Sequence, residues 1–335
     1  MITTDVVHVS DYTTPTKKGY FGYDDEAFYR AINVCLKTGG PLYIPAGKYT
    51  LEKKIFSPKA FDIYSDSGAF IRWVNPDDCG ILFDLTSSPH ALCSIQLPNL
   101  FGPAVDDNFS IPGYSFTNPT YDEYTRCGTA LMFVGGNRFN VTVHHIVGWE
   151  RGIVLESTNQ DIANVNVNVN TIDFCKQGIS LTGNRSTQAV VANANTIWAK
   201  YPIYLNGDSQ LITANRLTIA GQAFTNEYGG CGIFAIGGGD NISANTFDIN
   251  WLAAGYKSDS PPGTPTDLLC PFIGGTSGEC NIEGVGCFYG MRNKIRIGAA
   301  NIAVPEYAYQ HAPKATDSDR IRYIGSDNDV EILFV

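Results

Sequence analysis

Short stretches of alternating apolar and polar residues recur through the middle of the chain. A phrase of the form Asn-x-apolar-x-apolar begins at Asn170, Asn195, Asn215, Asn245 and Asn293. The first four copies start 25, 20 and 30 residues apart. Alternation with a period of two is typical of a β-strand with one buried face. The pattern therefore predicts short strands in this region.

A second phrase, close to Gly-Ile-x-Leu, follows several copies of the first. It begins at Gly152, Gly178, Pro202 and Gly232, at intervals of 26, 24 and 30 residues. The two phrases thus share one irregular period. A short strand cannot bury its apolar face alone, whereas stacked repeats bury a continuous column of side chains. The repeat therefore predicts a solenoid of stacked strands.

Asparagine is unusually frequent in this region, with 16 copies in the 114 residues 137–250. Asn suits the tight turn before each strand because it tolerates left-handed backbone angles. We also expect stacked Asn side chains to hydrogen-bond to one another and to the turn backbone. A meander of antiparallel hairpins is the alternative. It is disfavoured because Asn206-Gly207 is the one hairpin-type turn dipeptide here.

The start of the chain has a helical pattern followed by a strand. Residues 24–36 begin with acidic residues, carry apolar residues three and four positions apart, and precede Gly39-Gly40. These are the signals of a helix that ends in a glycine cap. Residues 41–51 then read as a strand broken by a Pro-Ala-Gly turn. Because a solenoid needs a lid over its first coil, we expect the helix to supply it.

This opening resembles that of pectate-lyase-like proteins. The residues that carry the resemblance are Asp24, Ala27 and Ala31, followed by Gly39-Gly40-x-Leu-x-Ile-Pro-x-Gly-x-Tyr49. The resemblance covers roughly residues 20–300 and implies an all-β fold, a right-handed single-stranded parallel β-helix with an N-terminal capping helix. The Asn phrase is then expected to begin one sheet, and the Gly-Ile-x-Leu phrase to lie in the next.

Within this superfamily, the short helix at the start is most similar to bacteriophage tailspikes and capsular polysaccharide depolymerases. The expected organisation is an N-terminal segment 1–22, a capping helix and first coil 23–52, a β-helix 53–300 with loop insertions near 98–126 and 257–287, and a C-terminal segment 301–335. The apolar end of that last segment is compatible with an oligomer interface. The resemblance implies a homotrimer.

Composition and charge narrow the classes of partner. The chain is 44% hydrophobic, has no apolar run long enough for a membrane-spanning helix, and shows no leader at its start. Its formal net charge of −10, without a Lys/Arg cluster, argues against nucleic acid. The nine cysteines form no CxxC pair, so we expect mostly buried, reduced thiols rather than a disulfide framework or a zinc site.

Strand alternation assigns sides to the candidate functional residues. Ile172 and Phe174 are expected to point inward, which leaves Asp173 outside, and the same register places Trp198 and Asp248 outside on equivalent coils. In the second phrase the isoleucines are expected inward and Ser180, Tyr204 and Phe234 outward. One flank would then present carboxylates beside side chains suited to bind sugar rings: Trp149, Arg151, Lys176, Trp198, Lys200, Tyr201, Tyr204 and Trp251.

Hydrolysis of a glycosidic bond is the first chemistry that this flank suggests. It needs one protonated and one ionised carboxyl group on either side of the bond. Glu150 and Asp173 are the preferred pair because they lie one coil apart on the same flank. Further candidates are Glu156, Asp208, Glu227 and Asp248.

β-Elimination on a uronic acid is the competing chemistry. It would draw on Arg151, Lys176, Lys200, His144 or His145, or on a bound calcium ion. No calcium-type Asp-x-Asp cluster occurs, and the acidic chain would repel a polyanion. Adjacent His144 and His145 are expected to face opposite ways and so not to share a metal ion. Neither a metal nor a cofactor is expected.

Together with the resemblance, these residues predict a phage-tailspike-like depolymerase that hydrolyses a bacterial capsule, exopolysaccharide or O-antigen. A polysaccharide lyase and a non-catalytic receptor-binding spike of the same fold are the alternatives. The expected location is a virion tail, after synthesis in the host cytoplasm. A secreted protein that has lost its leader is the other possibility.

Overall fold

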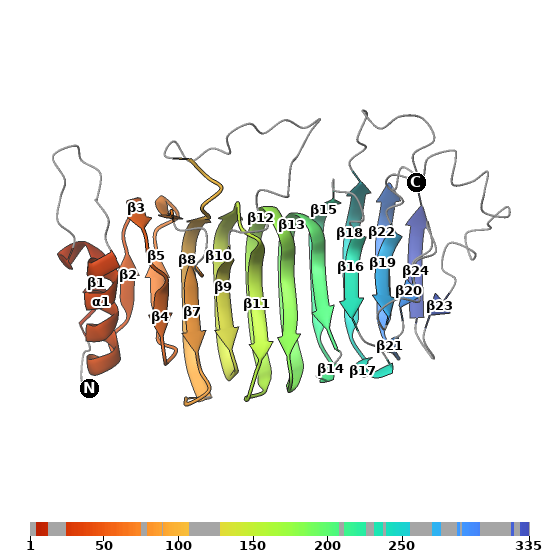
Figure 1. Cartoon of the computed structure of the whole chain (residues 1–335), viewed down its shortest axis with the longest axis horizontal. Helices are drawn as coiled ribbons and strands as arrows, with labels where there is room; N and C mark the ends of the chain where they lie inside the picture. Colours follow the sequence, from red (N-terminus) through yellow and green to blue (C-terminus); the bar gives the residue numbers. More distant parts are fainter. Residues whose placement is uncertain are drawn as a thin grey trace.

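The computed structural model is a parallel β-solenoid with one α-helix at its N-terminal end (Figure 1). The structure describes residues 5–12, 25–74, 79–88, 90–106, 128–207, 211–225, 231–236, 239–254, 270–275, 287–288, 290–301, 323–324 and 329–334. Every strand pairing registered within these ranges is parallel. The predicted solenoid is therefore confirmed, and the antiparallel meander is excluded for this part of the chain.

The first coils are built from short strands. They are β1 (Val7–His8), β2 (Leu42–Ile44), β3 (Gly47–Leu51), β4 (Ile55–Ser57), β5 (Ile63–Ser65), β6 (Ala69–Trp73) and β7 (Ile81–Asp84), with a 3-10 turn η1 (Val9–Tyr12). Strands β2 and β5 pair, as do β3 with β6 and β4 with β7. Each coil therefore adds one strand to each of several stacked ladders.

Later strands are longer and turn the corner from one sheet to the next. They are β8 (His90–Phe101), β9 (Thr129–Val134), β10 (Gly136–Val147), β11 (Arg151–Ser157), β12 (Ile162–Gly183) and β13 (Ser186–Asn206). The first half of β12 pairs with β10 and its second half with β11. We call the sheet that contains β8, β10 and the first halves of β12 and β13 the long sheet. The sheet that contains β9, β11 and the second halves is the second sheet.

The C-terminal coils continue both sheets. They comprise β14 (Leu211–Thr213), β15 (Arg216–Thr225), β16 (Cys231–Ile236), β17 (Gly239–Ser243), β18 (Thr246–Ala254), β19 (Cys270–Gly275), β21 (Gly290–Met291), β22 (Lys294–Asn301) and β24 (Asp329–Phe334), beside a separate pair β20 (Cys287–Phe288) and β23 (Tyr323–Ile324). Strand β19, within the insertion expected at 257–287, pairs with β16. Strand β24, within the expected C-terminal segment, pairs with β22.

The second sheet confirms the register read from the Gly-Ile-x-Leu phrase. Ile153, Ile179, Ile203 and Ile233 are aligned coil by coil, and each is buried. Complete burial of such a side chain contributes about 1.5–3 kcal/mol. A column of aligned isoleucines therefore supplies part of the continuous core that no single coil could form.

The Asn phrase proves to combine two different positions of the coil. Asn170 and Asn195 follow the aligned pair Val169 and Ala194 on the outer face of the long sheet, and both are exposed. Asn215, by contrast, precedes β15 and accepts a hydrogen bond from the backbone N–H of Val190. The register expected from Asn195 to Asn215 is therefore wrong. Both positions favour Asn, so the letters alone could not separate them.

Three of the asparagines form a buried ladder along the turn before the long sheet. The side-chain amide of Asn215 donates to Oδ1 of Asn245 at 3.0 Å, and that of Asn245 donates to Oδ1 of Asn293 at 3.0 Å. The same oxygens accept the backbone N–H of Asn215 and Asn245. Each amide also donates to the carbonyl of an earlier coil. The expectation that stacked asparagines satisfy one another and the backbone is confirmed here.

The left-handed turn residues lie one position before this ladder. Ala214, Ala244 and Arg292 have φ values of 55°, 56° and 54°. The equivalent turns on earlier coils place Ala189 and Asn164 at φ values of 53° and 55°. The expectation that Asn supplies the left-handed backbone angle thus holds for Asn164 only. At the later coils the ladder holds the turn in place and Asn serves as the buried hydrogen-bonding residue.

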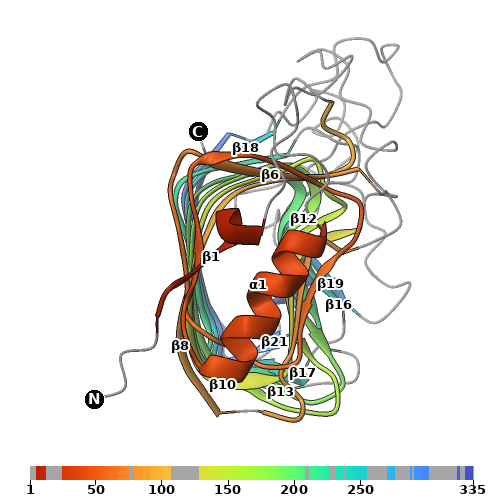
Figure 2. The same cartoon turned by 90° about the vertical axis from the view of Figure 1, so that its left-hand side faces the viewer.

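Helix α1 (Asp25–Thr38) covers the first coil, as expected (Figure 2). It buries Ala27, Phe28, Ala31, Ile32 and Cys35. The Asp25 carboxylate accepts backbone N–H groups of the first coil at residues 52 and 53, which ties the start of the helix to the solenoid. Gly39, with a φ of 73°, ends the helix.

The described cysteines behave as reduced core residues. Cys35, Cys79, Cys93 and Cys175 are free thiols, and all but Cys79 are buried. Burial raises the pKa of the Cys35 thiol to about 11 and that of Cys93 to about 12. These two thiols therefore stay protonated at neutral pH and serve as packing groups.

Candidate functional site

The end of β10 is a corner where the alternation of the strand breaks. Val143 and Ile146 are buried, whereas His144 is exposed and His145 is half-buried. Both histidines therefore lie outside the core, and the expectation that they face opposite ways is wrong. The corner where the long sheet bends toward the second sheet places two consecutive side chains on the outer surface.

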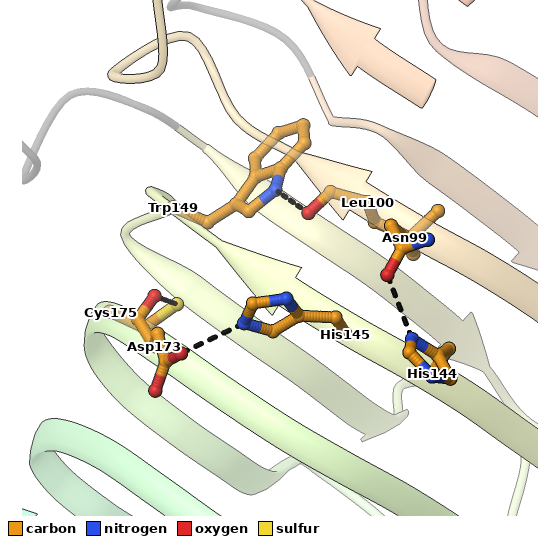
Figure 3. A network of polar contacts seen from close by, with 7 residues as sticks. All are labelled: Asn99, Leu100, His144, His145, Trp149, Asp173 and Cys175. Atoms are coloured by element: carbon orange, nitrogen blue, oxygen red, sulfur yellow. Dashed lines mark hydrogen bonds and ion pairs between the residues drawn. The ribbon is translucent and has the colours of Figure 1, made fainter. Parts of the chain in front are cut away.

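His145 makes an ion-pair contact with a carboxylate of the next coil. Its Nε2 atom lies 2.8 Å from Oδ2 of Asp173 (Figure 3). An ionised carboxylate only accepts hydrogen bonds, so Nε2 carries the proton in this contact. In the neutral ring, Nδ1 then holds the free lone pair. This is the arrangement in which a carboxylate orients an imidazole to act as a base.

The backbone next to Asp173 is irregular. Phe174 has a φ of 54°, unusual for a bulky residue, and Cys175 is the next residue to enter the core. The strand register shifts at this point. Phe174 is half-buried, with its ring 5.1 Å from that of Trp198. The expectation that Phe174 points inward is therefore wrong, while the placement of Asp173 outside the core is confirmed.

His144 has its own fixed partner. The side-chain amide of Asn99 donates to the carbonyl oxygens of Ser67 and Ala69, which fixes its Oδ1 atom as the end that faces His144. Nδ1 of His144 lies 2.8 Å from that Oδ1 atom (Figure 3). Nδ1 must then be the protonated nitrogen, and Nε2 of the neutral ring is the hydrogen-bond acceptor.

A groove runs beside this corner over the outer face of the long sheet. Its volume is about 460 Å³, and His144 is part of its lining. One row of polar side chains across successive coils is Gln96, Thr142, Asn168 and Asn193, and the adjacent row continues from His144 to Asn170 and Asn195. We call these seven residues the amide groove. None of them other than His144 was singled out from the sequence as functional.

The four candidate carboxylates are not gathered at one point. Asp173 aligns with Val147 on one neighbouring coil and with Trp198 on the other. Asp248 aligns with Thr218, Asn193 and Asn168, so it is not equivalent to Asp173, as the sequence register had placed it. At about 4.8 Å per coil it lies roughly 14 Å farther along the solenoid.

Glu150 and Glu156 lie beyond the corner. The Glu150 carbonyl accepts the backbone N–H groups of residues 176 and 177, so Glu150 lies three residues past the position aligned with Asp173. Three residues span at most about 10 Å of chain. Glu156 lies on β11 in the second sheet and accepts a hydrogen bond from Thr158. Asp208 and Glu227 lie outside the described residues.

Trp149 is a core residue, which corrects its assignment to substrate binding. Its exposed fraction is 0%, its ring lies 5.5 Å from that of Trp73, and its indole N–H donates to the carbonyl of Leu100. A ring without exposed surface cannot stack on a sugar. The sequence pattern could not show this, because the contact with Trp73 comes from an earlier coil.

We expect Trp149→Ala to destabilise the fold rather than to weaken ligand binding specifically. Loss of a large buried aromatic side chain costs about 3–5 kcal/mol. Thermal unfolding followed by circular dichroism checks this prediction. Trp251→Ala is the matched control, because Trp251 is 42% exposed, and it should leave the unfolding temperature nearly unchanged. Equal losses for the two variants would contradict the assignment.

The remaining binding candidates fall into separate groups. Lys200, Tyr201 and Tyr204 lie together where β13 enters the second sheet. The Tyr201 ring is 4.6 Å from Phe234, and the Lys200 ammonium is 5.6 Å from the Tyr201 ring. Tyr204 and Phe234 are half-buried on the outer face as expected, whereas Ser180 in the same row is buried. Arg151 and Lys176 are half-buried at the corner.

Metal and membrane sites find no support within the described ranges. No group of three or more His, Cys, Asp or Glu side chains that could hold a metal ion occurs there. None of the helices in the same ranges is long and apolar enough to cross a membrane.

Sequence reasoning missed the pairing of His145 with Asp173 and the amide groove. Val147 and Asp173 are aligned 26 residues apart, and one such spacing, read from the Gly-Ile-x-Leu phrase, would have placed Asp173 near the end of β10. The available signal was therefore the coil period itself. Applied to the long sheet, it would also have aligned the polar residues of the groove.

No protein-family model and no curated protein matches the sequence. Two solved structures are similar to it. The catalytic domain of Agl-KA is 16% identical with a TM-score of 0.39, and the match covers 100% of this chain and 69% of that one. The family 28 exopolygalacturonase of Yersinia enterocolitica is 13% identical with a TM-score of 0.36, over 97% of this chain and 78% of that one. The parallel solenoid itself is established by the strand pairing of this chain.

Proposed function

We propose that this protein degrades a bacterial surface polysaccharide, in line with its resemblance to tailspike depolymerases. The observation that carries the proposal is the contact between His145 and Asp173 at 2.8 Å, on an outer corner beside an open polar groove. A half-buried imidazole oriented by a carboxylate is suited to accept a proton from a substrate or from water. The groove supplies the extended surface that a polymer needs.

Hydrolysis is the reaction that we assign to this corner. His145 acts as the general base: its Nδ1 atom takes a proton from water as the water oxygen bonds to the anomeric carbon. Glu150 is the proposed general acid, which gives its proton to the glycosidic oxygen as the bond from that oxygen to the anomeric carbon breaks. Asp173 is a positioning residue, which holds the imidazole and stabilises its charged form.

The proposal retains Glu150 and Asp173 from the sequence analysis and changes the role of Asp173. In an inverting glycosidase the acid and the base stand about 6.5–9.5 Å apart, which leaves room for the water. Glu150 lies within about 10 Å of chain from the residue aligned with Asp173. The spacing along the chain is thus compatible with an acid on one side of the bond and the imidazole on the other.

Incubation with capsular, exopolysaccharide and O-antigen polymers tests this function. We expect shorter chains and new reducing ends without ultraviolet absorbance, because hydrolysis creates no double bond. Products that absorb in the ultraviolet would instead assign the reaction to a lyase, with His145 as the base that removes the proton next to a uronate. Binding without any cleavage would favour a spike that only recognises its polymer.

The tailspike resemblance also leads us to propose a homotrimer on a virion tail. The six apolar or acidic residues of β24 pair with β22 and end the described chain. Sedimentation of the purified protein measures the oligomeric state. A monomer at micromolar concentration would argue against the trimer and leave the enzymatic proposal in place.

A further inference from the structure

The polar side chains of the amide groove are not all occupied within the protein. Asn193 donates to Asn168 across one coil boundary at 3.1 Å. Among the described residues, the side chains of Gln96, Thr142, Asn170 and Asn195 make no hydrogen bond to another protein group, and all four are exposed. They therefore offer donors and acceptors to a ligand along several consecutive coils.

A neighbouring row on the same sheet shows the contrast. Asn166 donates to Asn140 at 2.8 Å, and Asn164 donates to Asn137 at 3.1 Å. These amides satisfy one another along the solenoid and do not line the groove. The same residue type thus closes on itself in one row and, in the groove, leaves much of its hydrogen-bonding capacity open.

The groove carries no fixed charge. Among the described residues that line it, none is Asp, Glu, Lys or Arg, and the titratable His144 is held by Asn99. An acidic sugar placed there would lose water from its carboxylate without gaining a cation, which is costly. The net charge of −10 adds long-range repulsion of a polyanion. Hydroxyl groups, by contrast, pair well with amide groups of both hydrogen-bonding types.

The spacing of the rows matches a linear chain parallel to the solenoid axis. Successive coils present one polar side chain in each row at intervals of about 4.8 Å. An extended glycan advances by a similar length for each hexose unit. The exposed Nε2 acceptor of His144 and the amides of Asn170 and Asn195 would each face a different sugar of the chain.

We propose that the amide groove binds an uncharged polysaccharide chain along the solenoid axis. This inference rests on the proposed function, because it names the substrate class of the same site. It also places the bound chain beside His145, one residue from His144 at the end of β10. The groove, rather than the aromatic flank expected from the sequence, then sets which polymer is accepted.

Calorimetric titration with hexasaccharides tests the inference. The probes are neutral gluco-, galacto- and mannohexaoses and, at equal length, an oligogalacturonate. The protein carries His145→Ala so that no probe is cleaved. We expect at least one neutral hexamer to bind, and its affinity to fall at least tenfold in the double variant Asn170→Ala/Asn195→Ala. Asn166→Ala, in the self-paired row of the same sheet, is the matched control and should retain full affinity.

Three results would overturn the inference: tighter binding of the oligogalacturonate, binding of no neutral hexamer, or neutral binding that the double variant leaves intact. The proposed function is judged separately, by cleavage of polymers with His145 present. Cleavage that persists at full rate in Asn170→Ala/Asn195→Ala would remove the groove and leave the enzyme. Groove binding without cleavage by the unmodified protein would do the reverse.

Discussion

Replacement of His145 by Ala is expected to lower the rate of polysaccharide cleavage by about 10²–10⁴-fold, the usual contribution of a general base. The side chain is partly exposed on the outer corner, and its one printed polar contact is with Asp173. The fold should therefore be retained. Release of reducing ends measures the rate, and circular dichroism measures the fold.

Two further variants separate a base from a structural histidine. His90→Ala removes an exposed histidine at the start of β8 and should leave the rate unchanged. Asp173→Asn should lower kcat by about 10–100-fold with little change in KM, because outer partners of an imidazole orient it without touching substrate. Asp173→Glu should recover part of the rate. An unaltered kcat in both His145→Ala and Asp173→Asn would remove this pair from the mechanism.

Asn245→Ala is expected to produce the largest loss of stability among single polar substitutions in the described residues. The Asn245 side chain accepts the backbone and side-chain N–H groups of Asn215 and donates to the carbonyl of Ile212. All these groups are buried, and each buried group left without a partner costs about 1–3 kcal/mol. The expected loss is about 3–5 kcal/mol in the free energy of unfolding, measured by denaturant titration.

The exposed row of the same sheet provides the matched comparison. Asn166→Ala also removes an amide that bonds across coils, at 2.8 Å to Asn140, but water can replace it there. Its effect should stay within about 0.5 kcal/mol, as for most surface substitutions. Similar losses in the two variants would show that burial of the ladder does not determine its contribution.

The ladder also shows why part of the fold could be predicted and part could not. The period-two alternation identifies Ile153, Ile179 and Ile203 as one inward column because each lies in an unbroken strand. The step from Asn195 to Asn215 fails because a polar residue is favoured both on the outer face and in the buried turn. A local phrase cannot distinguish these positions when both satisfy the same amide chemistry.

Irregular corners account for the other errors. At Phe174 a positive φ and a register shift exchange the inward position with Cys175, and at the end of β10 two consecutive histidines lie outside. A rule of strict alternation cannot foresee such changes, because they arise where the coil bends from one sheet into the next. Trp149 was misplaced for a related reason, since it packs into the core at the same bend.

The sequence alone determined the class of fold, the capping helix and the inward columns, because these depend on burying apolar surface with a short, repeated period. Only the tertiary structure decided which side chains meet across coils. The contact of His145 with Asp173 and the open rows of the amide groove join residues about one coil apart. Their alignment depends on turn geometry and bulges, in which a shift of one residue moves a side chain to the opposite face.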